Sequence, residues 1–414
     1  MATTIERRSA LRGLRCRACG ALQPADERYV CGECMGPIEP EYDLASFDRE
    51  ELRATISDGP RSLWRYAPLL PVAEPASHYP VGWTPLIHAP RLGAAIGVDQ
   101  LYLKDDTRNP TLSFKDRPVA VALARALELG LDTLACASTG NLAGAVAAAA
   151  ARNGLRAFVF VPADTEEGKI ASAAAYGATV VRVDGPYDAV NRLCGRLADE
   201  HGWGFVNFTL RPYYAEGSKT LLFECAEQLG WNLPDHVIVP VGSGALLTRT
   251  ATAVAQLKAT GLVPDTRCRI SSAQPAGCAP VSDAVLDSWR PVRPVRAPNT
   301  LARSLAIGSP ADGDDSVRII RESSGSAGSV TDEDIREATD LLAKAEGLLV
   351  EPAGGVVVAT ACALAWRGGF GDDERVVLYL TGNGYKGGPE TRELGPVIKA
   401  DADVFRAAYA KEIS

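Results

Sequence analysis

Short apolar runs alternate with helix-like runs along most of the 414-residue chain, and this alternation narrows the folds that the chain can adopt. The runs of strand length are Leu101–Lys104, Thr133–Ala137, Ala157–Val161, Thr179–Val183, Phe205–Phe208, His236–Val241 and Arg375–Leu380. The helix-like runs are Val119–Leu129, a stretch from Leu142, Lys169–Tyr176, Asn191–Asp199, Leu221–Leu229, Leu246–Leu257 and a stretch from Thr331. Strands that alternate with helices of this length form parallel sheets covered on both faces, so the sequence predicts an α/β fold.

Composition and charge restrict the classes of function. Hydrophobic residues make up 46% and charged residues 23% of the chain, which is typical of a globular protein with sizeable cores. The 43 Lys and Arg residues against 51 Asp and Glu residues give a net charge of −8, which argues against a general nucleic-acid or membrane-surface role. No apolar run reaches the roughly 18 residues of a membrane span, and the first 15 residues lack the apolar core of a secretory signal. We therefore expect a cytoplasmic protein without nucleic-acid or membrane partners.

Four of the ten cysteines form two C-x-x-C pairs near the start of the chain, Cys16 with Cys19 and Cys31 with Cys34. Two such pairs separated by a short loop have the spacing of a zinc ribbon, in which each tight turn presents two thiolates to one tetrahedral ion. Four sulfur ligands close the site, so structural zinc is expected. Reduced thiols or a pair of disulfides are the alternatives. A nucleic-acid ribbon is disfavoured because acidic residues are interspersed with the few arginines of this segment.

The stretch Asn109–Arg117 contains the residue that we expect to carry the chemistry. Asn109 and Pro110 signal a turn, and Ser113 is expected to cap the following helix, which places Lys115 in its first turn. The positive end of a helix dipole lowers the pKa of a nearby ammonium group, and a neutral amine is what Schiff-base chemistry with an aldehyde needs. The alternative is a surface lysine that happens to begin a helix.

Three glycine-bearing segments follow predicted strands: Ser138–Asn141, Val241–Ala245 and Thr381–Gly384. Ligands of open α/β sheets bind where strands end and helices begin. The glycines of Val241–Ala245 let backbone N–H groups converge on an anion at a helix N-terminus. Each segment alone could be an ordinary turn. Their joint presence with Lys115 favours a cofactor site.

The chain resembles the threonine synthase family, among the fold type II pyridoxal-phosphate enzymes of the tryptophan synthase β-subunit superfamily. The resemblance extends from about Trp83 to Gly387. Some members of the family carry an N-terminal zinc ribbon, which fits the four paired cysteines. The motifs that carry it are Thr84–Leu86, Asn109–Thr111, Ser113–Arg117, Ala137–Asn141, Glu216–Thr220, Pro240–Gly244, Ala306–Pro310, Val350–Ala353 and Thr381–Gly384.

This resemblance implies a two-domain architecture with parallel-rich sheets, plus the small N-terminal ribbon. We expect a zinc-ribbon-like segment over residues 1–45, a large α/β domain formed by 46–110 and 215–414, and a small α/β domain over 111–214. The polar, aromatic and proline-bearing stretch Tyr42–Pro80 is interpreted as a linker or arm before the main fold. A homodimer is expected from the family alone.

The resemblance also implies a role for individual residues. Lys115 would hold pyridoxal 5'-phosphate covalently and then shuttle protons, Phe114 would pack against the ring, Asn141 would bond its 3'-oxygen, and Thr381 would face its nitrogen. The loop that would hold the cofactor phosphate consists of Gly242, Ser243, Gly244, Ala245 and Leu246. The expected substrate-binding residues are Thr84, Ser113, Ser138 and Thr139. Taken alone, Phe114 could instead be plain core and Thr381 a strand-end hydroxyl.

The implied reaction is a γ-elimination followed by β-replacement, which converts O-phospho-L-homoserine and water to L-threonine and phosphate. The expected partner is therefore a small amino-acid substrate. None of the four histidines lies in a matched motif, which disfavours a histidine base.

Several residues depart from the family pattern. Leu112 replaces a glycine, Tyr214 an arginine that helps bind substrate phosphate, Leu246 an asparagine and Tyr385 a leucine. Loss of an arginine weakens recognition of a dianionic phosphate. A related pyridoxal-phosphate enzyme that acts on another amino acid in a specialised pathway is therefore the alternative. A binding module on a scaffold that has lost catalysis is a third possibility, disfavoured because Lys115 and the glycine loop are present.

Overall fold

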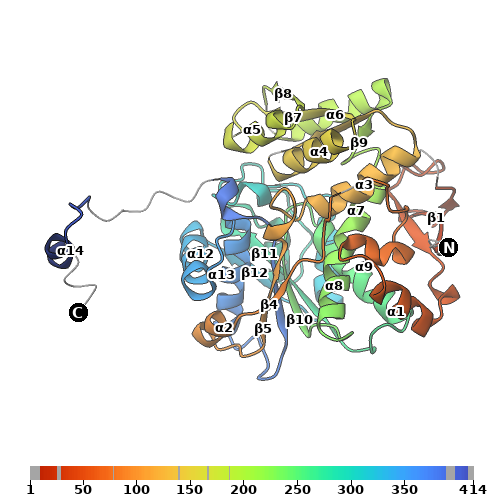
Figure 1. Cartoon of the computed structure of the whole chain (residues 1–414). Coiled ribbons are helices and arrows are strands. Elements are labelled where there is room, and N and C mark those ends of the chain that lie inside the picture. Colours follow the sequence, from red (N-terminus) through yellow and green to blue (C-terminus); the bar gives the residue numbers. More distant parts are fainter. Residues whose placement is uncertain are drawn as a thin grey trace, which may run out of the picture.

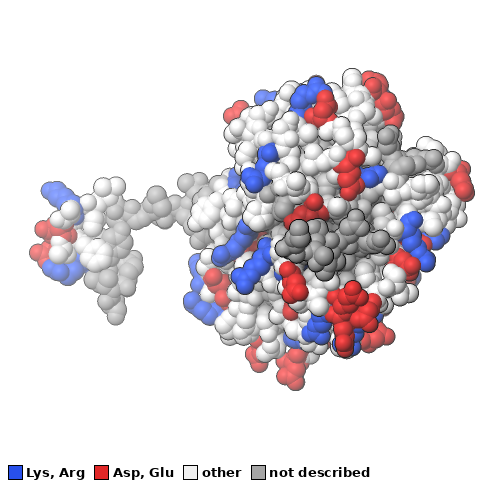
Figure 2. Space-filling view, turned by 45° about the vertical axis from the view of Figure 1, so that its right-hand side comes forward, with Lys and Arg blue, Asp and Glu red and all other residues white. Residues whose placement is uncertain are grey.

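The computed structural model describes residues 10–25, 29–77, 79–138, 140–165, 167–185, 187–387 and 397–408, and these form two α/β lobes and a small N-terminal antiparallel sheet (Figure 1). The α/β prediction is confirmed. No helix in the described ranges is long and apolar enough to cross a membrane. On the face that Figure 2 shows, Lys and Arg side chains are interspersed with Asp and Glu side chains.

The large lobe is built on a six-stranded sheet in the order β12-β11-β10-β13-β5-β4. All neighbouring strands are parallel except the edge pair β4·β5, which is antiparallel. The strands are β4 Leu86–His88, β5 Leu101–Asp105, β10 His236–Pro240, β11 Arg269–Pro275, β12 Ala327–Val330 and β13 Val376–Leu380.

Helices cover both faces of this sheet and create two separate cores. Because side chains alternate along a strand, Val377 and Tyr379 of β13 point into one core, and Val376, Leu378 and Leu380 into the other. The first core is covered by α8 Thr220–Gln228, α9 Ala245–Ala259, α10 Pro280–Leu286 and α11 Gly313–Glu322. The second is covered by α2 Pro90–Ile96, α12 Asp332–Glu346 and α13 Pro352–Trp366. Helix α12 begins at the predicted place, where Thr331 and Asp334 form a capping box.

The small lobe has a four-stranded, fully parallel sheet in the order β8-β7-β6-β9. Its strands are β6 Thr133–Ala137, β7 Arg156–Pro162, β8 Thr179–Val183 and β9 Gly204–Phe205. Its helices are α3 Asp116–Glu128, α4 Asn141–Arg152, α5 Glu167–Ala175 and α6 Tyr187–His201, and α7 Arg211–Glu216 leads back to the large lobe. The strand predicted over Phe205–Phe208 is wrong in extent, since β9 ends at Phe205. The domain ranges stay a prediction, although each sheet falls within one of them.

The N-terminal sheet consists of β1 Leu11–Cys16, β2 Leu22–Gln23 and β3 Ile38–Tyr42. It is followed by α1 Arg49–Ser57, and α14 Ala402–Ala408 lies near the end of the chain. Short 3-10 helices are η1 Leu44–Ser46, η2 Leu63–Leu69, η3 Asp106–Arg108, η4 Gly217–Lys219, η5 Ala276–Cys278, η6 Arg303–Leu305 and η7 Gly384–Lys386.

The interpretation of Tyr42–Pro80 as a linker or arm is wrong. Helix η2 is buried throughout, and Trp64 and Tyr66 are fully inaccessible to solvent. The Tyr66 hydroxyl donates to Glu227 Oε2 of α8 at 2.5 Å. Prolines and polar residues suggested an exposed segment, but burial of Tyr66 against α8 and of Trp64 in the core beside the N-terminal sheet outweighs that local signal.

A fully buried group of charges fixes the start of α3 against the large lobe. Arg117 Nε donates to Asp106 Oδ2 at 2.7 Å, and its terminal nitrogens donate to both Glu224 oxygens at 2.5 and 2.8 Å. Lys104 Nζ lies 2.7 Å from Glu224 Oε2. Burial alone would raise the pKa of Glu224, but Arg117 and Lys104 outweigh it and lower the pKa to about 2. These contacts join α3, β5, η3 and α8.

We predict that Arg117→Met lowers the free energy of unfolding by about 3–5 kcal/mol, because two buried carboxylates lose their shared cation. Urea unfolding followed by circular dichroism measures the change. Arg156→Met is the matched control, since the ion pair of Arg156 and Asp132 has side chains that are 61% and 77% exposed. The control should change the free energy by less than about 1 kcal/mol. Equal decreases in the free energy of unfolding of the two variants would contradict a stabilising role for the buried charge group.

Candidate active site

The Lys115 segment lies beside the carboxyl end of the central strand β13. The Phe114 N–H donates to the Thr381 carbonyl at 2.9 Å, and the Asn383 N–H donates to the Leu112 carbonyl at 3.0 Å. These bonds flank an antiparallel bridge between Ser113 and Gly382. Two of the predicted segments, far apart in the sequence, are therefore hydrogen-bonded to each other.

Lys115 occupies the N-cap position of α3, whose first residue is Asp116. The prediction that Ser113 caps this helix is wrong, because no side chain caps it and the fully buried Ser113 Oγ has no hydrogen-bond partner among the described residues. Burial lowers the pKa of Lys115 to about 8. The sequence predicts this direction, but its cause is loss of solvation rather than the helix dipole.

Two aromatic rings flank the Lys115 amine. Its Nζ lies 5.5 Å from the centroid of the Phe114 ring and 5.9 Å from that of the Tyr214 ring on α7. Phe114 is buried and Tyr214 is half-buried. Burial also raises the pKa of the Tyr214 phenol, which therefore stays neutral across the physiological range.

Asn141 is the first residue of α4 and joins the small lobe to the large one. Its Nδ2 donates to Glu351 Oε2 at 2.5 Å, and the Glu351 N–H donates to the Gly382 carbonyl at 2.9 Å. A Cβ at Gly382 would lie 2.0 Å from Glu351 Oε2, so a side chain there would displace the carboxylate that accepts from Asn141. Glu351 is not among the predicted site residues, although it lies in the motif Val350–Ala353.

Ser138 shapes the turn before α4. Its Oγ accepts the N–H groups of Gly140 and Ala143, each at 3.0 Å. Gly140 has a φ of 148°, which disfavours residues with a side chain. Thr139, one of the predicted substrate-binding residues, lies outside the described residues.

The glycine loop Gly242–Leu246 leads into α9 with unused amide groups. Among the described residues, the N–H groups of Gly242, Ser243, Gly244 and Leu246 have no hydrogen-bond acceptor, and that of Ala245 has only Ser243 Oγ at 3.5 Å. The first turn of α9 carries no acidic residue. Such a helix start is suited to binding an anion.

The back of this loop rests on the start of α11. The Asp312 N–H donates to the Ser243 carbonyl at 2.9 Å. Gly244 has a φ of 95°, and a Cβ there would lie 2.7 Å from Ser316 Oγ and 2.8 Å from the Asp312 carbonyl oxygen. The loop therefore depends on glycine both for its backbone conformation and for its close packing on α11.

Thr84 is one of the predicted substrate-binding residues, and that role stays a prediction. It is 3% exposed and lies in the buried charge group. Its hydroxyl donates to Asp106 Oδ1 at 2.7 Å and accepts from Arg117 at 3.0 Å. The hydroxyl of Thr84 thus both donates and accepts a hydrogen bond within the buried charge group.

A cavity of about 180 Å³ opens beside Asn141, between the Lys115 loop and the helices α4 and α5. Lys386, which the sequence analysis did not select, also lines it and donates to the Thr111 carbonyl at 2.6 Å. The remaining lining residues are Pro110, Thr111, Leu112, Gly140, Gly144, Gly168, Ser172 and Tyr176. Lys115 is not among them.

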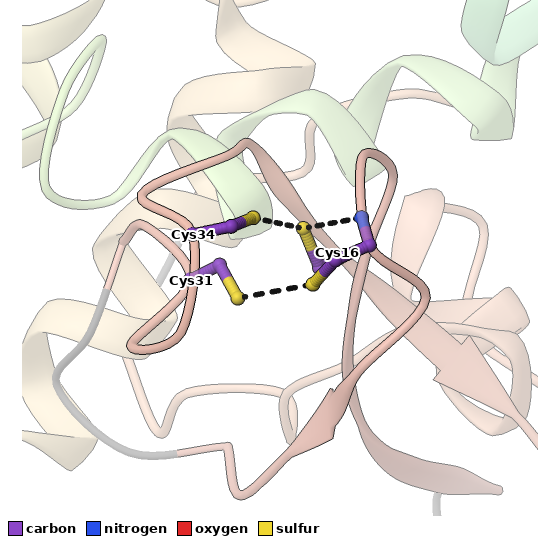
Figure 3. A group of neighbouring side chains, drawn as sticks. Cys16, Cys31 and Cys34 are labelled. Atoms are coloured by element: carbon purple, nitrogen blue, oxygen red, sulfur yellow. Dashed lines mark hydrogen bonds between the residues drawn. The ribbon is translucent and has the colours of Figure 1, made fainter.

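The four predicted metal ligands converge in the N-terminal segment. The sulfur atoms of Cys16, Cys19, Cys31 and Cys34 all lie within 4.8 Å of one another. Cys16 Sγ is 3.5 Å from Cys34 Sγ, and Cys19 Sγ is 3.6 Å from Cys31 Sγ; Figure 3 shows Cys16, Cys31 and Cys34 turned toward one centre. Zn–S bonds of about 2.3 Å in a tetrahedron require sulfur atoms about 3.8 Å apart. The donor set therefore fits zinc.

Comparisons with known proteins identify the family of the chain. A family model described as pyridoxal-phosphate dependent enzyme matches residues 78–382. Threonine synthase from Methanosarcina acetivorans is 37% identical over 403 residues, which cover 95% of this chain and 98% of that protein. Threonine synthase from Methanocaldococcus jannaschii is 35% identical over 375 residues, which cover 90% and 92% of the two chains.

Solved structures share the fold. The processed form of threonine deaminase isoform 2 from Solanum lycopersicum aligns with a TM-score of 0.62 at 22% identity, covering 81% of this chain and 85% of that one. Maize serine racemase aligns with a TM-score of 0.63 at 20% identity, covering 88% and 96%. At these identities the two structures support the fold alone. The chain thus belongs to the pyridoxal-phosphate dependent enzymes of fold type II and, among them, to the threonine synthase family.

Proposed function

We propose that this protein is an enzyme that converts O-phospho-L-homoserine and water to L-threonine and phosphate, with pyridoxal 5'-phosphate as its cofactor. The observation that carries the proposal is the Lys115 amine, whose pKa of about 8 lies near working pH and which is held by β13 between two aromatic rings. Relatives named threonine synthase match nearly the whole chain, which supports the choice of reaction.

The residues around Lys115 fit the proposed cofactor. The free amide groups of the glycine loop at the start of α9 are suited to its phosphate, and Lys115 to its aldehyde. Phe114 would pack against its ring and Asn141 would donate to the ring oxygen. Thr381, half-buried at the end of β13, would face the ring nitrogen with a neutral hydroxyl. The buried Ser113 Oγ, which has no partner in the described part of the protein, is a further polar group for the substrate side of this site.

The cofactor, when bound, supplies an electron sink for charge that develops at the carbons of the substrate. The chain supplies the proton transfers and the orientation. Lys115 takes a proton from the substrate α-carbon and returns protons later, which requires an amine with a pKa near working pH. Glu351 holds the Asn141 amide in one orientation. Ser138 orders the turn that leads into α4 and so fixes the backbone next to Asn141.

A second candidate function is replacement or elimination on a different amino acid, and Tyr214 favours it. A neutral aromatic ring lies 5.9 Å from the Lys115 amine, at a position where the resemblance to the threonine synthase family implies an arginine. The nearest arginine on the same helix, Arg211, is engaged by Asp312 Oδ2 at 3.0 Å. A site with fewer cations near the amine binds a phosphate dianion less strongly.

We also propose a structural zinc ion at the four cysteines, a homodimer and a cytoplasmic location. The sulfur geometry supports zinc. The ten cysteines are all free thiols, as is usual for proteins in a reducing compartment. The dimer is proposed by analogy with the family.

We predict that the purified enzyme releases phosphate and threonine in equal amounts from O-phospho-L-homoserine. Lys115→Ala should lower kcat by at least about 10³-fold, because the group that moves the protons is lost. It should also lose the visible absorbance of the lysine-bound cofactor. Coupled phosphate detection and amino-acid analysis measure the products. An active wild-type enzyme that consumes other amino acids but not this substrate would favour the second candidate function.

The lowered pKa of Lys115 predicts the pH dependence of cofactor capture. Only the neutral amine attacks the aldehyde, so the capture rate of cofactor-free protein should rise with pH through about 8 and then level off. An ordinary lysine would give a rise that continues toward about pH 10.4. Stopped-flow absorbance measures the rate, with N-acetyl-lysine as the reference amine. A pH dependence of the capture rate identical to that of N-acetyl-lysine would contradict the lowered pKa of Lys115.

The zinc proposal predicts one zinc ion per chain in protein prepared without chelator. Cys16→Ser combined with Cys34→Ser should remove it, because a tetrahedral site loses two of its four ligands. Elemental analysis by mass spectrometry measures the content. Cys362→Ser is the matched control, since this half-buried cysteine lies on α13, and it should keep the metal. Full zinc content in the double variant would refute the site.

A further inference from the structure

The turn between the first two metal-ligating cysteines carries an arginine that reaches into the large lobe. Arg17 lies between Cys16 and Cys19, and its N–H donates to the Pro37 carbonyl at 2.9 Å. Its guanidinium donates to Asp312 Oδ1 at 3.2 Å and forms an ion pair with Asp315. The side chain of Arg17 is 31% exposed, whereas that of Asp312 is 5% exposed.

Asp312 contacts the glycine loop on its other side. Its N–H donates to the Ser243 carbonyl, and its carbonyl oxygen lies 2.8 Å from the position that a Cβ of Gly244 would take. Its second carboxylate oxygen accepts from Arg211 of α7. A continuous path of contacts therefore leads from the four-cysteine turn through Arg17 and Asp312 to the loop with free amide groups.

A second connection leads from the same sheet to α9. Glu39 of β3 accepts from Arg17 at 3.1 Å and from Arg249 of α9 at 2.6 Å. Arg249 also donates to Glu216 Oε1 at 3.0 Å, and Tyr42 of β3 donates to Glu216 Oε2 at 2.6 Å. Figure 1 shows the N-terminal segment lying alongside α7 and α9. The N-terminal sheet thus contacts the helix whose first turn contains the free amides.

We propose that Arg17 and Asp312 are positioning residues that couple the four-cysteine metal site to the cofactor-phosphate loop, so that zinc binding strengthens the binding of pyridoxal 5'-phosphate. The proposal rests on the proposed function, since it uses the loop and the zinc site assigned there. Zinc fixes Cys16 and Cys19 and hence the backbone of the turn that carries Arg17. Arg17 in turn fixes Asp312, on which the conformation of Ser243 and Gly244 depends.

Coupling between zinc binding and pyridoxal 5'-phosphate binding is reciprocal, so it can be measured as a change in binding affinity instead of in activity. The dissociation constant of pyridoxal 5'-phosphate is measured by absorbance titration of cofactor-free full-length protein, with zinc bound and with zinc removed by a chelator. Removing zinc from the wild type should raise this constant about fivefold or more, the lower end of typical coupling between two sites.

The variant Arg17→Gln tests whether the coupling passes through the contact between Arg17 and Asp312. With zinc bound, this variant should bind the cofactor about threefold to fivefold more weakly, in keeping with a partly exposed ion pair, and removing zinc should then have little further effect. Arg17→Lys keeps the charge and should restore part of the zinc effect. Arg15→Gln is the matched control, because Arg15 pairs with Glu41 inside the N-terminal sheet and should leave the zinc effect as in the wild type.

Asp312→Asn gives an independent test that keeps the backbone bond to Ser243 and removes the charge that holds Arg17. It should reproduce the loss of the zinc effect. The proposal is overturned if removing zinc weakens cofactor binding as much in Arg17→Gln as in the wild type. It is also overturned if removing zinc does not change the cofactor affinity of the wild type. Neither outcome affects the proposed function. A wild type that binds no pyridoxal 5'-phosphate overturns the proposed function itself, so the two failures are distinguishable.

Discussion

The buried contact between Arg117 and the carboxylates of Asp106 and Glu224 holds the two lobes of the site in register. Lys115 precedes Arg117 by two residues, so fixing the guanidinium also fixes the place where the chain leaves β5 and enters α3. The charged side chains are fully inaccessible to solvent, so a buried carboxylate or guanidinium without its partner of opposite charge would destabilise the fold. The position of the proposed catalytic amine therefore depends on an ion cluster that takes no part in the chemistry.

Hydrogen bonds between distant segments then bring the chemical groups together. The end of β13 pairs with the Lys115 segment, and Glu351 connects that same strand end to Asn141 in the small lobe. The glycine loop is supported separately, by Asp312 at the start of α11. Backbone bonds carry most of these connections, which favours a rigid arrangement of the groups that would meet the cofactor.

The alternating pattern was sufficient to predict the α/β class, and local motifs singled out Lys115, Asn141, the glycine loop and the four cysteines. These features are visible in a single sequence because they are short-range: strand and helix periodicity, glycine turns and C-x-x-C spacing. The expected cap by Ser113 is wrong because α3 begins two residues later than expected, with Lys115 at its N-cap position. The hydrogen bonds of Thr84 to Asp106 and Arg117 could not be predicted, because these partners lie far away in the sequence. The buried η2 segment and the contacts of Glu351 and Asp312 depend on tertiary packing in the same way, and a single sequence carries no local signal for them.

The central position of β13 in the large sheet bears on how the enzyme matures during synthesis. This strand lies between β10 and β5, and the residues that directly follow it are hydrogen-bonded to the Lys115 segment. During synthesis, the six-stranded sheet stays incomplete until residue 380 has emerged from the ribosome, even if the small lobe folds earlier. A chain that lacks this strand cannot join β10 to β5, so the cofactor pocket is completed only once β13 is in place.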